Sequence, residues 1–158
     1  MPHSSPTSLS SSKRRGANPV PVSTRLLPLP DEVIGELLIE YHMTLANLRR
    51  GAGDFRHFAT MARVVVLTCH LFQAGYGEAQ VDGLMEVQDA LDRSHRKAVD
   101  TGVWGVDEAS FELLADLLVL HEEQLRAAPL NVVARWNDKV GQGGKASAAR
   151  SPSMRTAA

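Results

Sequence analysis

Apolar residues recur every three or four positions between residues 31 and 127, a spacing that predicts amphipathic α-helices. Polar or glycine-containing breaks divide this part of the chain into four helices, which we expect at residues 31–50, 54–74, 78–100 and 108–127. Short loops between helices of similar length favour antiparallel neighbours. The sequence therefore predicts an all-α fold, an antiparallel up-down four-helix bundle.

Residues with strong positional preferences stand at the ends of these helices. Asp54 and Asp107 precede the second and fourth helices, where a short acidic side chain accepts hydrogen bonds from the first free backbone amides. Gly51 follows the first helix and suits the left-handed conformation that ends many helices. Pro129 ends or kinks the fourth helix, and we expect a short C-terminal fifth helix that stops near Val140, before the glycine-rich sequence GQGGK.

The two ends of the chain lack helical periodicity. Residues 1–30 are rich in serine and proline, and they contain too little apolar surface to offset the entropic cost of ordering. Residues 141–158 are glycine-rich, small and basic. We therefore expect one helical domain at residues 31–140, flanked by disordered basic tails at residues 1–30 and 141–158.

Charge is distributed unevenly, although the net charge is only −1. Residues 1–30 and residues 139–158 each hold four basic residues and no acid, while residues 31–138 hold nine basic residues and all 18 acids. An acidic body disfavours a groove-reading DNA-binding domain, but basic tails suit non-specific phosphate contacts. One alternative function is therefore a nucleic-acid-linked regulator that uses its basic ends, with candidate contacts at Lys13, Arg14, Arg15, Arg135, Lys139 and Lys145.

The second predicted helix is apolar nearly all round from Met61 to Phe72. Such a helix is either the most buried one in its bundle or one that also faces a second subunit. The leading hypothesis is a non-enzymatic helical-bundle module for protein–protein contact, acting as a homo-oligomer or as an adaptor. The residues chosen as its candidate interaction surface are Phe58, Met61, Val65 and Phe72.

Cys69 and His70 raise the question of a chemical site inside the same helix. Adjacent helical residues point about 100° apart, so any partner must come from another helix. In an up-down bundle His121 would lie near the same end as His70, and Glu36 or Asp82 would supply a carboxylate. A metal site at His70 and His121 is therefore a second alternative, although no Glu-x-x-His pair supports it. The competing interpretation is that Cys69 is a small buried hydrophobe and that both histidines are structural.

Motifs that define common enzyme classes are absent from the sequence. It contains no GxSxG, no P-loop, no GxGxxG after a strand and no CxxC. We therefore expect no enzymatic activity and no cofactor. His42, His57 and His95 are expected near the first loop, where a cluster of them would respond to pH near neutrality.

The single cysteine excludes an intrachain disulfide, and the longest apolar runs fall short of a membrane span. The N-terminal segment also lacks the uninterrupted apolar run of a secretory signal. These features predict a soluble, cytoplasmic protein that has no membrane partner.

Overall fold

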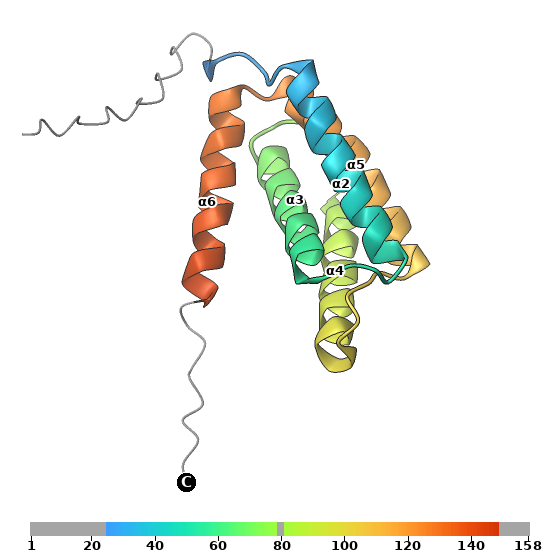
Figure 1. Ribbon diagram of the computed structural model, residues 1–158. Coiled ribbons are helices and arrows are strands. Elements are labelled where there is room, and N and C mark those ends of the chain that lie inside the picture. Colours follow the sequence, from blue (N-terminus) through green and yellow to red (C-terminus); the bar gives the residue numbers. More distant parts are fainter. Residues whose placement is uncertain (1–24, 79–80, 149–158) are drawn as a thin grey trace, which may run out of the picture.

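The computed structural model describes residues 25–78 and 81–148, with side chains described as far as Gly141. The described residues form helices and turns, with two isolated β-bridges and no strand (Figure 1). The all-α prediction is therefore confirmed for this part of the chain. The principal helices are α2 (Asp31–Arg49), α3 (Phe55–Gln73), α4 (Val81–Thr101), α5 (Glu108–Ala127) and α6 (Leu130–Ala148).

Both predicted acidic N-caps are present. The Asp54 carboxylate accepts a hydrogen bond from the His57 backbone amide at 2.9 Å, and the His57 ring in turn contacts the Asp54 backbone amide, which completes a capping box. Asp107 accepts a hydrogen bond from the Ser110 backbone amide at 2.8 Å. These hydrogen bonds fix where α3 and α5 begin.

Helices α2, α3, α4 and α5 share one apolar core. Helix α2 packs against α3 and α5, α4 packs against the same two helices, and α3 also contacts α5 directly. These contacts are compatible with a four-helix bundle, and the up-down order of its helices stays a prediction. The centre of the core is formed by large side chains with almost no exposed surface, among them Leu45, Leu48, Met61, Leu114 and Leu118.

The fifth helix is not short, which corrects the sequence-based expectation. Helix α6 is 19 residues long, as is α2, and it continues through the glycines at 141, 143 and 144 to Ala148. Glycine weakens a helix by about 1 kcal/mol per residue but ends it only where the backbone turns left-handed. Gly51 does so at the end of α2, with φ of 68°, whereas the glycines of α6 keep the helical conformation.

Helix α6 packs against α3 and runs antiparallel to it (Figure 1). Its first turn places Val133 in a second apolar cluster with Leu67 and Leu71, near the end of α3. Seven residues further on, Val140 lines the same hollow as Phe55, near the start of α3. Helix α6 is therefore an additional element laid along one side of α3.

The segment before α2 is attached to the start of α6. Pro28 and Pro129 form an isolated antiparallel bridge, and the Leu130 amide donates to the Leu27 carbonyl at 2.8 Å. Leu29 packs against the second apolar cluster. Residues 25–30 were assigned to the N-terminal tail from the sequence, but they cover part of the body. The remaining tail residues, 1–24 and 149–158, lie outside the described residues.

Candidate functional site

Three of the four residues predicted to form an interaction surface are buried in the core of their own chain. Phe58 is 5% exposed, Met61 0% and Val65 1%, and Phe72 packs against the same core at intermediate burial. Met61 and Val65 are therefore core residues, whereas Phe58 and Phe72 also line hollows at the edge of the core. The physical reason is that an apolar pattern all round a helix does not show which face its own bundle covers.

A different line of α3 residues faces outward between α4 and α6. We call it the α3 outer stripe, and it consists of Phe55, Ala59, Ala62, Val66, Cys69 and Gln73. The spacing alternates between four and three residues, which keeps all six on one side of the helix. Phe55 is 60% exposed and Val66 39% exposed. The stripe is thus an apolar, partly exposed face that α4 and α6 border but do not cover.

Two hollows lie along the α3 outer stripe. The first has a volume of about 430 Å³ and lies between α3, α4 and α6; its α3 lining includes Phe58 and Arg63 besides four residues of the stripe, Phe55, Ala59, Ala62 and Val66. The second, of about 290 Å³, lies between α3 and α4, where exposed Met85 and Val81 line one side. Small side chains at two positions of the stripe leave the α3 backbone accessible to a close neighbour.

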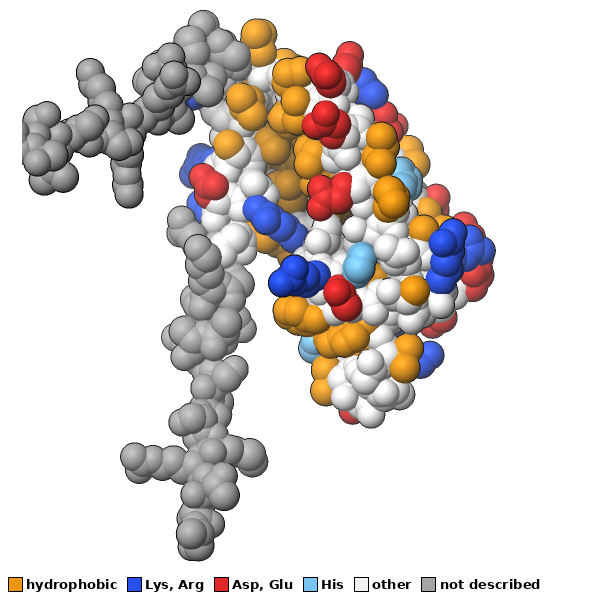
Figure 2. Space-filling model, viewed as in Figure 1, with side chains coloured by type: hydrophobic (Ala, Val, Ile, Leu, Met, Phe, Trp, Pro, Cys, Tyr) orange, Lys and Arg blue, Asp and Glu red, His pale blue; other side chains and the backbone are white. Residues whose placement is uncertain are grey.

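Charge separates the helices into two groups. Helix α3 has two arginines and no acid, and α6 has three basic residues and one acid, whereas α2 has four acids and one arginine. In Figure 2 carboxylates follow α2, and basic side chains face them from the side of α3 and α6. The surface of α3 is therefore electrostatically complementary to the surface of α2.

The candidate metal-ligating histidines lie in separate environments. His70 stacks on Trp136 of α6, with ring centroids 4.3 Å apart and planes at 10°. His121 is fully buried, and its Nδ1 lies 2.9 Å from Thr68 Oγ1. Within the described residues no group of three or more His, Cys, Asp or Glu could hold a metal ion. The structure thus does not assemble the predicted site.

The proton on His121 can be assigned from the hydrogen bonds of Thr68. The Thr68 hydroxyl donates its one proton to the Val64 carbonyl at 2.8 Å, so it can only accept from His121. His121 therefore carries a proton on Nδ1. Its Nε2 is buried and has no hydrogen-bond partner among the described residues. Burial lowers the pKa of His121 from 6.5 to about 4, against a smaller opposing effect of the Gln124 side chain, so the ring is neutral at pH 7.

Cys69 is half-buried and contacts α4. Its Sγ accepts a hydrogen bond from Gln88 Nε2 of α4 at 3.3 Å. Burial raises the pKa of the Cys69 thiol, which disfavours the reactive thiolate. This environment fits the structural interpretation of the cysteine.

The three histidines expected near the first loop have different partners. His57 belongs to the α3 capping box and also contacts Asn47 at 3.2 Å, His95 packs against Phe58 and Trp104, and His42 is exposed. No hydrogen bond or ring contact joins one of them to another in the part of the chain described. They are thus independent of one another and do not form a pH-responsive cluster.

The candidate nucleic-acid contacts are only partly described. Arg135 and Lys139 are exposed on α6, and the Lys139 ammonium lies 4.4 Å from the centre of the Trp136 ring. Lys13, Arg14 and Arg15 lie outside the described residues, as does the side chain of Lys145. The structure thus brings together two of these six residues, on one turn of α6.

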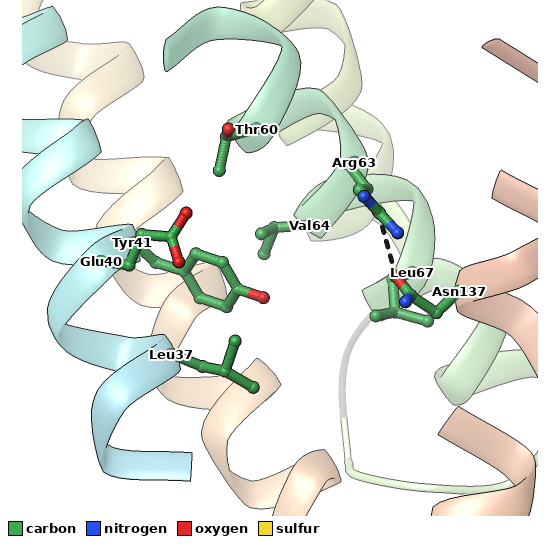
Figure 3. Close-up of a pocket in the computed structure, with 8 residues that line it drawn as sticks. All are labelled: Leu37, Glu40, Tyr41, Thr60, Arg63, Val64, Leu67 and Asn137. Atoms are coloured by element: carbon green, nitrogen blue, oxygen red, sulfur yellow. Dashed lines mark hydrogen bonds between the residues drawn. The ribbon is translucent and has the colours of Figure 1, made fainter. Parts of the chain in front are cut away.

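A third hollow lies where α2, α3 and α6 meet, and sequence reasoning missed it (Figure 3). It has a volume of about 230 Å³. Its apolar floor comes from Leu37, Val64 and Leu67, and its polar residues are Glu40, Tyr41, Thr60, Arg63 and Asn137. This hollow could not be predicted from the sequence. Asn137 was expected on a short terminal helix, and the sequence did not show which helix that one packs against.

Comparisons with known proteins do not indicate a function for these features. None of the helices in the described ranges is long and apolar enough to cross a membrane. The chain matches no known family model, no curated protein and no solved structure, so its function has to be argued from the geometry of its own residues.

Proposed function

We propose that this protein is a non-enzymatic interaction module that self-associates, with the α3 outer stripe of one copy receiving helix α2 of a second copy. The observation that carries the proposal is the stripe itself, an apolar face with helical spacing that lies between two helices of its own chain. A face of this shape fits one further helix, because side chains of a docking helix enter the spaces between residues spaced by three and four.

Helix α2 has the properties required of that docking helix. Its outward face exposes Ile39 and Met43, each 63% exposed and four residues apart. Glu32 and Glu36 are exposed on the same side of the helix. The α3 stripe is flanked by the exposed arginines 56 and 63. The contact therefore combines apolar burial with opposite charges, which favours this pairing over contact between two α3 stripes.

The two surfaces differ, so the contact is heterologous. A heterologous contact repeats from copy to copy until a ring closes or a chain grows. We expect the average particle mass in solution to rise with protein concentration. The cytoplasmic location and the role as an adaptor or accessory regulator remain predictions.

Matched valine variants test this function. Val66→Glu places a charge on the α3 outer stripe, while Val119→Glu places one on the exposed face of α5, where the valine is 58% exposed. Light scattering of the full chain over a concentration series is expected to show self-association for the natural protein and Val119→Glu, and its loss in Val66→Glu. A strictly monomeric natural protein at the highest concentration would contradict the proposal.

Charge exchange supplies a second test of the same contact. Arg56→Glu and Glu36→Lys are each expected to weaken self-association, and an equimolar mixture of the two variants is expected to restore it by pairing the new charges. Binding to a labelled DNA duplex, measured at several salt concentrations, distinguishes the alternative nucleic-acid function from self-association. Salt-sensitive DNA binding that Arg135→Glu and Lys139→Glu abolish, in a natural protein that stays monomeric, would favour the nucleic-acid function instead.

A further inference from the structure

The hollow between α2, α3 and α6 holds more hydrogen-bonding capacity than the chain itself uses. Arg63 Nε donates to Asn137 Oδ1 at 3.0 Å, which orients both side chains toward the hollow (Figure 3). No other side-chain hydrogen bond of Arg63, Asn137, Glu40, Tyr41 or Thr60 occurs among the described residues. The remaining guanidinium protons and the Asn137 Nδ2 group are free to donate.

Acidic and basic groups stand on different walls of this hollow. Glu40 comes from α2, whereas Arg63 and Asn137 come from α3 and α6, on the other side in Figure 3. No ion pair joins Glu40 to Arg63 within the described ranges. Glu40 and Arg63 thus face the same hollow without forming an ion pair with each other. Such an arrangement favours a ligand that carries both a positive and a negative group.

The hydroxyl groups add donors between these walls. The Tyr41 phenol points into the hollow in Figure 3. Burial and the neighbouring Glu40 carboxylate raise the pKa of Tyr41, so the phenol keeps its proton. Thr60 lines the same hollow from α3.

We infer that this hollow binds a free α-amino acid with an aliphatic side chain. Glu40 receives the ammonium group, Arg63 and Asn137 bind the carboxylate, and Leu37, Val64 and Leu67 contact the side chain. The volume of about 230 Å³ lies below the roughly 300–1,000 Å³ typical of sites for drug-sized ligands, which restricts the ligand to a molecule of this size. This inference does not depend on self-association.

Calorimetry of the full chain with three related probes tests the inference. L-leucine carries both charges, N-acetyl-L-leucine lacks the ammonium group, and 3-methylbutylamine lacks the carboxylate. L-leucine is expected to bind at least about 10-fold more tightly than either analogue, since each analogue leaves one charged wall without its partner. Failure of L-leucine to bind at about 10 mM would overturn the inference.

A matched pair of glutamate variants locates the binding. Glu40→Gln removes the acidic wall and is expected to weaken L-leucine binding about 10-fold, while leaving the affinity for N-acetyl-L-leucine unchanged. Glu32→Gln, on the same helix and away from the hollow, is expected to bind L-leucine normally. Equal binding of L-leucine and N-acetyl-L-leucine by the natural protein, or equal effects of the two variants, would contradict the amino-acid site. Light scattering of Glu40→Gln shows whether this variant also changes self-association, so that a loss of L-leucine binding can be told apart from a loss of self-association.

Discussion

The buried His121 should make the stability of the protein fall in mildly acidic solution. The neutral ring donates to Thr68 and is 0% exposed, and its pKa is lowered from 6.5 to about 4. Between these values the unfolded chain binds a proton that the folded chain does not. The free energy of unfolding therefore decreases as the pH falls from about 6.5 to about 4, and this contribution is fully present above pH 6.5.

The size of the effect follows from the pKa shift. A lowering from 6.5 to about 4 corresponds to about 3 kcal/mol of stability lost across this range. Asp54 and Asp107 also have lowered pKa values, because of hydrogen bonds with His57 and with Ser110 respectively. Their stabilisation is present above the ordinary aspartate value of 3.8 and is lost at lower pH, so it falls outside the His121 range.

Urea unfolding at a series of pH values measures this loss. His121→Gln keeps an amide in place of the ring but cannot titrate, so it is expected to be less stable at neutral pH and nearly insensitive to pH between about 4 and 6.5. His42→Gln replaces an exposed histidine and serves as the control, with the pH profile of the natural protein expected. An equal pH dependence in His121→Gln and the natural protein would refute the assignment.

Four further substitutions test the packing and a helix cap, three of them by urea unfolding and the fourth by limited proteolysis. A Cβ at Gly53 would lie 2.6 Å from Leu48 Cδ2 and 2.8 Å from a backbone oxygen, so Gly53→Ala is expected to destabilise by about 1–3 kcal/mol. A Cβ at Gly35 meets nothing within 4 Å, and Gly35→Ala is expected to stabilise α2 by up to about 1 kcal/mol; a loss of stability there would contradict the described helix. Asp107→Ala removes the α5 cap and should cost about 1 kcal/mol, and no loss would exclude the cap. Trp136→Ala removes the ring on which His70 stacks, so limited proteolysis is expected to cleave within α6 sooner than in the natural protein; unchanged cleavage would show that the stack does not hold α6.

The positions of the first four long helices could be predicted because their signals are local. Apolar spacing located the helices, and the N-caps Asp54 and Asp107 located two of the starts to within a residue. The exposed face of α3 could not be predicted from its own residues, since nearly all of them are apolar. Which of them are buried depends on where α4 and α6 lie.

The length of α6 was the main error in the fold. Three glycines after Val140 suggested a tail, yet the helix continues through them. The hollow that contains Arg63 and Asn137 was missed for another reason: Asn137 lay within the expected short helix, but the sequence did not show that this helix packs along α3. His121 and Thr68 show the same difficulty, because their hydrogen bond joins residues 53 positions apart and leaves no local signal.

Cross-linking between two single-cysteine chains tests the proposed contact most directly. Both chains carry Cys69→Ser; one adds Ile39→Cys on α2, and the other adds Ala62→Cys on the α3 outer stripe. If α2 of one copy docks on α3 of the next, mild oxidation of the mixture should give disulfide-linked dimers of the two chains, because these bonds form only between α-carbons within about 7 Å. No such dimer, or an equal yield when Val119→Cys replaces Ile39→Cys, would contradict the account.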